Sequence, residues 1–85
     1  MKVLVPGALR SYTGAAEVEA DGATMAELLA DLDRQYPGLR FRVIDEQERM
    51  RPHLRFFVTG TQVFDLGHGL KADDAVQIVL ALSGG

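Results

Sequence analysis

One amphipathic helix limits how this chain can fold. The segment Thr24-Met25-Ala26-Glu27 matches a capping box, in which the threonine hydroxyl accepts from the amide three residues on and the glutamate reaches back to the amide of the cap residue. A helix of about three turns with a single apolar stripe must cover one face of a sheet. Pro37-Gly38 ends this helix, whose apolar residues recur at helical spacing: Met25, Leu28, Leu29, Leu32 and Tyr36.

The residues before the helix predict two short strands. Residues 1–5 are rich in β-forming residues, and residues 15–20 alternate between outward glutamates and an inward Val18. Residues 8–14 form the connection between these strands, with Leu9 turned inward. We therefore expect a hairpin with a long loop.

After the helix, the sequence predicts a helical turn, a loop and three further strands. Residues 39–44 form the turn and offer Phe41, Val43 and Ile44 for burial. Residues 45–52 are charged and lack periodicity, so they are expected to form a surface loop. The predicted strands, with a compact connection before the last one, are residues 54–59, 62–64 and 76–82.

Alternation in the first and last of these strands separates an inner from an outer side. Phe57, Val79 and Ala81 fall on the outer side. If the two strands are neighbours, the outer face carries an apolar patch beside the C-terminus, and such patches often mark partner surfaces. The alternatives are that these are single exposed apolar residues, which are common, or that the loop at 45–52 covers Phe57. The inner side is formed by Leu54, Phe56, Val58, Val76, Ile78, Leu80 and Leu82.

The order strand, strand, helix, strand, short strand, strand predicts an α+β domain. We expect residues 1–82 to form a mixed sheet of four to five strands, with one main helix packed on one face. A chain of 85 residues suffices for one thin core and leaves no room for a deep, self-contained active site.

Composition excludes several classes of protein. A formal net charge of −3 gives no electrostatic footprint for nucleic acid or an anionic membrane, and no apolar run is long enough to span a bilayer. Because the sequence has no cysteine, it can form neither disulfides nor thiolate metal sites, and it has no thiol nucleophile. We therefore expect a cytoplasmic protein that is monomeric when free.

The chain ends in Ser83-Gly84-Gly85, directly after the last predicted strand. Two glycines add nothing to a core and lose much backbone entropy when they are ordered. A carboxylate on a flexible thread without Cβ atoms can, however, enter a narrow slot about 10 Å from the last strand position. Residues 83–85 are either ordinary terminal fraying or the functional end of the molecule.

The sequence offers few other candidates for catalytic or binding sites. His53 and His68 lie far apart in a chain without cysteine, which argues against a metal site. Asp73 and Asp74 are typical of a solvated turn, and Gly67-His68-Gly69 lacks the strand-to-helix context of a phosphate loop. The sequence predicts neither a bound cofactor nor catalytic groups of its own.

Three features together resemble the ThiS/MoaD family of sulfur carriers, which have the β-grasp, ubiquitin-like fold. These are the order of elements, the terminal Gly84-Gly85 and the segment Leu-Lys-Ala-Asp-Asp-Ala-Val at residues 70–76. The opening Val-Pro-Gly-Ala-Leu-Arg at residues 5–10, followed by Thr13-Gly14, is similar to the MoaD-like and cysteine-biosynthesis branch. The resemblance covers essentially the whole chain, although only the glycine pair carries the chemistry.

This resemblance implies roles for the tail residues and for partner proteins. An adenylating enzyme of the ubiquitin-activating type, using ATP and magnesium, would form an acyl-adenylate on Gly85. Sulfur from a persulfide or sulfide would displace AMP and leave a thiocarboxylate. Gly84 would let the backbone lie close to the partner's slot, with Ser83 as a spacer. A synthase or a sulfhydrylase would then pass the sulfur to molybdopterin, cysteine, methionine or a secondary metabolite; the length and the opening segment make thiamin a less favoured product.

Two rival functions stay open. A ubiquitin-like modifier would be activated in the same way and then joined to lysines of target proteins through Gly85. A β-grasp binding module would need no chemistry at its tail. Lysine-linked conjugates would indicate the modifier, and function that survives deletion of Gly84-Gly85 would indicate the binding module.

Overall fold

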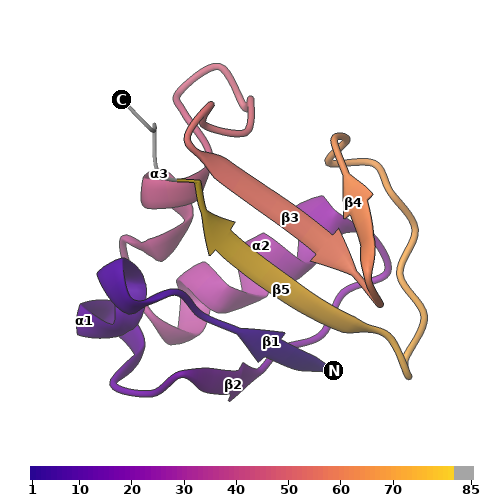
Figure 1. The fold of residues 1–85 in the computed structure, drawn as a ribbon, viewed down its shortest axis with the longest axis horizontal. Coiled ribbons are helices and arrows are strands. Elements are labelled where there is room, and N and C mark those ends of the chain that lie inside the picture. Colours follow the sequence, from indigo (N-terminus) through magenta and orange to yellow (C-terminus); the bar gives the residue numbers. More distant parts are fainter. Residues whose placement is uncertain (82–85) are drawn as a thin grey trace.

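The structure is a computed structural model that describes residues 1–81. Figure 1 shows a single sheet with α2 crossing behind its strands. The predicted inner residue Leu82 and the predicted tail at 83–85 lie outside the described residues. In chain order the elements are β1 (Lys2–Leu4), η1 (Gly7–Leu9), α1 (Arg10–Thr13), β2 (Glu17–Glu19), α2 (Met25–Gln35), α3 (Leu39–Val43), β3 (Leu54–Val58), β4 (Thr61–Val63) and β5 (Ala75–Leu80).

The five strands form one mixed sheet in the order β2-β1-β5-β3-β4. The central strands β1 and β5 are parallel, whereas the other neighbouring pairs are antiparallel. Parallel neighbours need a long crossover connection, and here the intervening chain supplies both the core helix and the β3–β4 hairpin. This arrangement confirms the predicted α+β, β-grasp fold.

The core lies between the sheet and α2, as the alternation and the helical stripe predict. Val3 lies opposite Val76 in the β1–β5 register, and Phe56 lies opposite Ile78 in the β3–β5 register. These four side chains are at most 2% exposed. They belong to one buried cluster with the apolar stripe of α2, which is formed by Met25, Leu28, Leu29 and Leu32. Tyr36, the predicted fifth member of the stripe, follows the helix and is partly exposed.

The start of α2 is capped in one respect as predicted. The hydroxyl of Thr24 accepts from the amide of Glu27 at 3.2 Å. The carboxylate of Glu27 does not reach the amide of Thr24; it accepts from the amide of Ala23, also at 3.2 Å. This half of the predicted capping box was therefore wrong. An isolated β-bridge pairs Thr24 with Gly69 in the β4–β5 connection, through the carbonyl of Ala23 and the amide of Met25. The first two helical amides also donate to carbonyls of that connection, which therefore closes over the helix start.

The connection expected at residues 8–14 is helical, since η1 and α1 fill it. Leu9 is buried as predicted. The amides of Leu9 and Gly14 donate to the carbonyls of Pro6 and Arg10, so these turns satisfy their polar groups locally and leave no periodic signal. Gly14 ends α1 with a φ of 70°, a left-handed conformation that glycine adopts at little cost.

Burial in α3 differs from the prediction at one residue. Val43 and Ile44 are buried as expected, but Phe41 is 58% exposed. Leu39 and Val43 are four residues apart and share the inner side of this short helix, so Phe41, midway between them, lies on the opposite side.

The last strand is shorter than predicted. β5 ends at Leu80, which is partly buried against the core. Among residues 1–81, no helix has both the length and the apolar character needed to cross a bilayer.

Candidate functional site

The end of β5 is the point from which the C-terminal tail departs. β5 is a central strand, and Leu80 lies opposite Leu54 at its end. The amide of Ala81, a half-buried residue, donates to the carbonyl of His53 at 2.7 Å, so pairing continues one residue past the strand. We call Leu80 and Ala81 the tail root. The residues expected to carry the chemistry follow it and lie outside the described residues: Ser83, Gly84 and Gly85.

The outer face of the sheet presents apolar side chains beside the tail root. Phe57 and Val79 are half-buried on the neighbouring strands β3 and β5. They lie diagonally, because Arg55 is opposite Val79 and Gln77 is opposite Phe57. Leu4 of β1, 36% exposed, flanks Gln77 from the other side. The structure therefore brings the predicted pair together, with polar side chains interleaved.

Leu4 is an outer-face residue that sequence reasoning missed. The alternation of side chains along a strand could have predicted its position. Val3 and Val5 share the inner side, so the residue between them must face outward.

Two hollows flank the tail root, and Leu80 lines both of them. The hollow on the β1 side has a volume of about 520 Å³ and is bordered by Leu4, Arg10 and Val79, among others. The hollow on the α3 side, of about 310 Å³, is bordered by Leu9, Phe41, Arg42, Arg51 and His53, among others. A further hollow of about 530 Å³ lies along β4 and contains both acidic and basic side chains.

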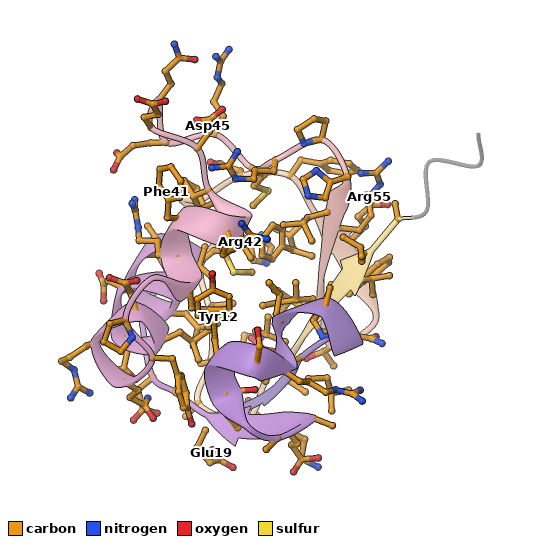
Figure 2. The ribbon with its side chains drawn as sticks, turned by 90° about the vertical axis from the view of Figure 1, so that its left-hand side faces the viewer. Tyr12, Glu19, Phe41, Arg42, Asp45 and Arg55 are labelled. Atoms are coloured by element: carbon orange, nitrogen blue, oxygen red, sulfur yellow. The ribbon has the colours of Figure 1, made fainter. Side chains whose placement is uncertain are left out.

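Basic side chains surround the tail root. Arg42, Arg51 and His53 line the hollow on the α3 side, and Arg10 lines the other. Figure 2 shows Arg42 on α3 and Arg55 on β3 at this end of the molecule. None of these arginines forms an ion pair with a carboxylate of residues 1–81. Sequence reasoning missed this cluster, because its members come from four separate segments.

The remaining candidate residues do not form a site. His53 lies at the tail root, whereas His68 lies in the β4–β5 connection, where its carbonyl accepts from the first amide of α2. Asp74 closes a turn, since its amide donates to the carbonyl of Lys71 at 3.0 Å. The amide of Lys71 (2.8 Å) and the hydroxyl of Thr59 (2.7 Å) donate to its carboxylate and lower its pKa. Within the described part of the chain, no three His, Asp or Glu side chains gather as metal ligands would.

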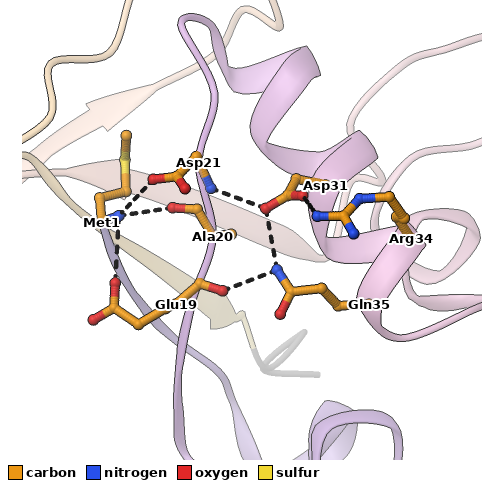
Figure 3. Close-up of polar contacts among 7 residues, drawn as sticks. All are labelled: Met1, Glu19, Ala20, Asp21, Asp31, Arg34 and Gln35. Carbon is orange, nitrogen blue, oxygen red and sulfur yellow. Dashed lines mark hydrogen bonds and ion pairs between the residues drawn. The ribbon is translucent and has the colours of Figure 1, made fainter.

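The opposite end of the sheet holds a network of bonded charges (Figure 3). The Met1 ammonium group contacts the carboxylates of Asp21 at 3.3 Å and Glu19 at 3.4 Å. Burial works against this charge, but the two carboxylates outweigh it and raise the pKa of the amine. Asp31 of α2 accepts from the amide of Asp21 at 3.0 Å and pairs with Arg34, and these two contacts, the amide first, lower its pKa. The network ties β1 and β2 to α2.

Comparisons with known proteins identify relatives over the whole chain. The sequence profile of the ThiS family matches residues 3–85. A chain of the crystal structure of the Amycolatopsis orientalis BexX/CysO complex is 31% identical, with 99% of this chain and 98% of that chain covered and a TM-score of 0.91. For Mycobacterium tuberculosis CysO the identity is 26%, the covered shares are 95% and 98%, and the TM-score is 0.90. Haloferax volcanii SAMP1 is 26% identical, with 100% of this chain and 98% of that chain covered and a TM-score of 0.80. No curated protein sequence matches significantly.

Proposed function

The chain belongs to the ThiS family of ubiquitin-like sulfur carriers, and from this premise we propose that it carries sulfur as a thiocarboxylate on Gly85. Relatives of this kind are small carrier proteins rather than enzymes, so partner proteins would supply the catalytic groups. The observation that carries the proposal is the family match, because it extends through the terminal Gly84-Gly85.

The proposed reaction starts at the α-carboxylate of Gly85, whose reference pKa of about 3.3–3.7 keeps it anionic at neutral pH. One carboxylate oxygen attacks the α-phosphorus of ATP, held with Mg²⁺ in an adenylating enzyme of the ubiquitin-activating type, and pyrophosphate leaves. Sulfide then attacks the acyl carbon and displaces AMP, which leaves the thiocarboxylate. A persulfide in place of sulfide gives an acyl disulfide, which a thiol must then reduce. The carrier contributes the position of the reacting carboxylate.

The position of the tail root supports this role. Residues 82–85 reach at most about 14 Å when extended, so a partner that acts on Gly85 must approach the end of β5 closely. Phe57, Val79 and Ala81 are the proposed contacts of that partner on the outer face, joined by Leu4, since all four lie on or beside the central strands of the sheet.

Two steps of the proposal can be tested together by mass spectrometry. The full chain is incubated with the adenylating enzyme encoded in the same genome, ATP, Mg²⁺ and sulfide. We expect the C-terminal peptide to exchange one oxygen for sulfur. Gly84→Val, which places a β-branched side chain where the tail enters the slot, should abolish the exchange and leave the melting temperature unchanged. Normal adenylation of this variant would contradict the proposal.

The proposed acceptor is a biosynthetic enzyme, either a sulfhydrylase or the large subunit of a synthase. Similarity to two CysO structures supports the cysteine-biosynthesis branch, so a sulfhydrylase is the first acceptor to test. The purified thiocarboxylate is mixed with each enzyme and its small-molecule substrate. Loss of the sulfur from Gly85 together with a thiol product identifies the acceptor.

A second candidate function is that of a protein modifier. SAMP1, one of the similar structures, is named small archaeal modifier protein 1. In this role the activated Gly85 would form an isopeptide bond with lysines of other proteins. Tryptic peptides from the source organism that carry residues 72–85 of this chain on a lysine would support the modifier, and a thiocarboxylate without such peptides would support the carrier.

A further inference from the structure

We propose that the arginines around the tail root form a docking surface for an acidic face of the protein that activates the tail. This inference rests on the proposed function, because it concerns the partner that receives Gly85. The surface, which we call the basic collar, consists of Arg10, Arg42, Arg51, His53 and Arg55.

The distribution of charge sets the collar apart from the rest of the molecule. The chain has a net charge of −3, yet four of its nine lysines and arginines lie in the collar. Neither hollow beside the tail root is lined by an aspartate or a glutamate. Of the five lysines and arginines outside the collar, four pair with acids of the chain itself and Lys71 forms no ion pair with residues 1–81. The pairs are Lys2 with Glu17, Arg34 with Asp31, Arg40 with Glu48, and Arg49 with Asp45.

Hydrogen bonds to backbone carbonyls hold three of the collar arginines in place without neutralising them. Arg10 donates from Nε to the carbonyl of Val5 at 3.1 Å. Arg51 donates from Nε and Nη2 to the carbonyl of Phe41, at 2.9 and 2.7 Å, and its guanidinium lies 5.0 Å from the centroid of the Phe41 ring. Arg55 donates to the carbonyl of Pro52 at 2.6 Å. A guanidinium stays charged under all physiological conditions, so these contacts orient positive charge toward a partner.

Phe41 adds an exposed apolar side chain to one side of the collar, next to Arg51 (Figure 2). Its ring is 58% exposed and carries the stacked Arg51 on one face. Aromatic residues and arginine are enriched in protein interfaces and among the residues that contribute most to binding. The carboxylate of Asp45 accepts from the amides of Arg49 and Gln47, pairs with the Arg49 guanidinium at 3.8 Å and also attracts Arg51, so it offsets part of the positive charge at Arg51.

The short reach of the tail makes the collar part of any contact with the activating protein. A partner close enough to bind Gly85 faces the side chains that surround Ala81. Complementary charge there would speed association and set the orientation of the carrier. The occupant that fits is a protein surface with several carboxylates beside an apolar contact for Phe41.

The test measures adenylation of the full chain by its cognate enzyme, as ATP–pyrophosphate exchange against carrier concentration. Arg42→Glu and Arg55→Glu should each raise the KM for the carrier about tenfold or more, with kcat changed less than about twofold. Arg42→Lys keeps the charge and should stay within about twofold of the wild type. Lys71→Glu makes the same charge change in the β4–β5 connection, at the far end of the sheet, and should leave KM unchanged. The wild-type KM should rise with salt more steeply than that of Arg42→Glu.

The possible outcomes separate the collar inference from the proposed sulfur-carrier function. If the wild type is adenylated and the collar variants keep its KM, the collar inference is wrong and the carrier function stands. An equal rise of KM in Lys71→Glu would reduce the effect to net charge and overturn the inference. If NMR shows that ATP alone binds the isolated protein at Arg42, the collar binds nucleotide phosphates and the inference is wrong. A wild type that is never adenylated overturns the proposed function and this inference with it.

Discussion

The two ends of the sheet use charge in opposite ways. Where β1 begins, the Met1 ammonium group and Asp31 are engaged by partners within the chain, and together they join β1, β2 and α2. At the tail root, three of the four arginines donate to backbone carbonyls, and none of the four pairs with a carboxylate of residues 1–81. Phe41 is exposed beside Arg51. Charges neutralised within the chain hold elements together, whereas charges left without an acidic partner are available to another molecule.

Because the end of the sheet with the charge network holds elements together, we expect substitutions there to have the largest effect on stability. The position with the largest expected effect is Gly22, the residue after Asp21. A Cβ at this position would lie 2.4 Å from the amide nitrogen of Leu28, so Gly22→Ala forces the backbone at the start of α2 to shift. We expect the free energy of unfolding, measured with urea, to fall by about 1–3 kcal/mol. Gly69→Ala is the matched control, since its Cβ would meet no atom within 4 Å. Equal stability of the two variants would contradict close packing at this end.

A smaller, pH-dependent effect is expected at Asp31. The amide of Asp21 and the guanidinium of Arg34 hold its pKa in the folded protein below the ordinary value of 3.8. Its contribution to stability is therefore complete above that value and is lost as the pH falls through the lower, folded pKa. Asp31→Asn should melt at a lower temperature than the wild type at neutral pH, and the difference should vanish in strong acid. The exposed Asp73→Asn is the control, and a difference at Asp31 that persists in acid would rule out the titration.

The smallest effect on stability is expected in the basic collar. Arg42→Gln should change the free energy of unfolding by less than about 0.5 kcal/mol, because Arg42 is exposed and forms no ion pair with residues 1–81. Urea unfolding of this variant and the wild type checks the prediction. A loss comparable to that of Gly22→Ala would make Arg42 part of the fold and remove the contrast between the two ends.

Most of the fold follows from local patterns. The stripe of α2 and the alternation of β3 and β5 each specify which side of an element is buried, and the structure confirms both at Leu28, Phe56 and Ile78. Such patterns work because an amphipathic element has one favourable way to bury its apolar side. They do not extend to η1 and α1, where locally bonded turns leave no periodic trace in the sequence.

The surroundings of the tail were less predictable. Phe57 and Val79 could be placed on an outer side from alternation, but that they are neighbours depends on β5 lying beside β3. Phe41 was expected inside, because apolar character alone does not reveal that a short helix turns one side away from the core. The arginines come from separate parts of the chain, residues 10, 42 and 51–55, and the tertiary structure brings them together around the end of β5.

The residues alone therefore indicate the class of fold, the main helix and the terminal glycine pair. The first two follow from patterns of near neighbours, and the glycine pair is read directly at the C-terminus. The surface around the tail root cannot be recognised in this way. It forms because β5 lies between β1 and β3, so that η1, α3 and the start of β3 meet where the tail begins. Pairing between distant segments creates that surface, and a pattern within one segment carries no record of which segment lies beside it.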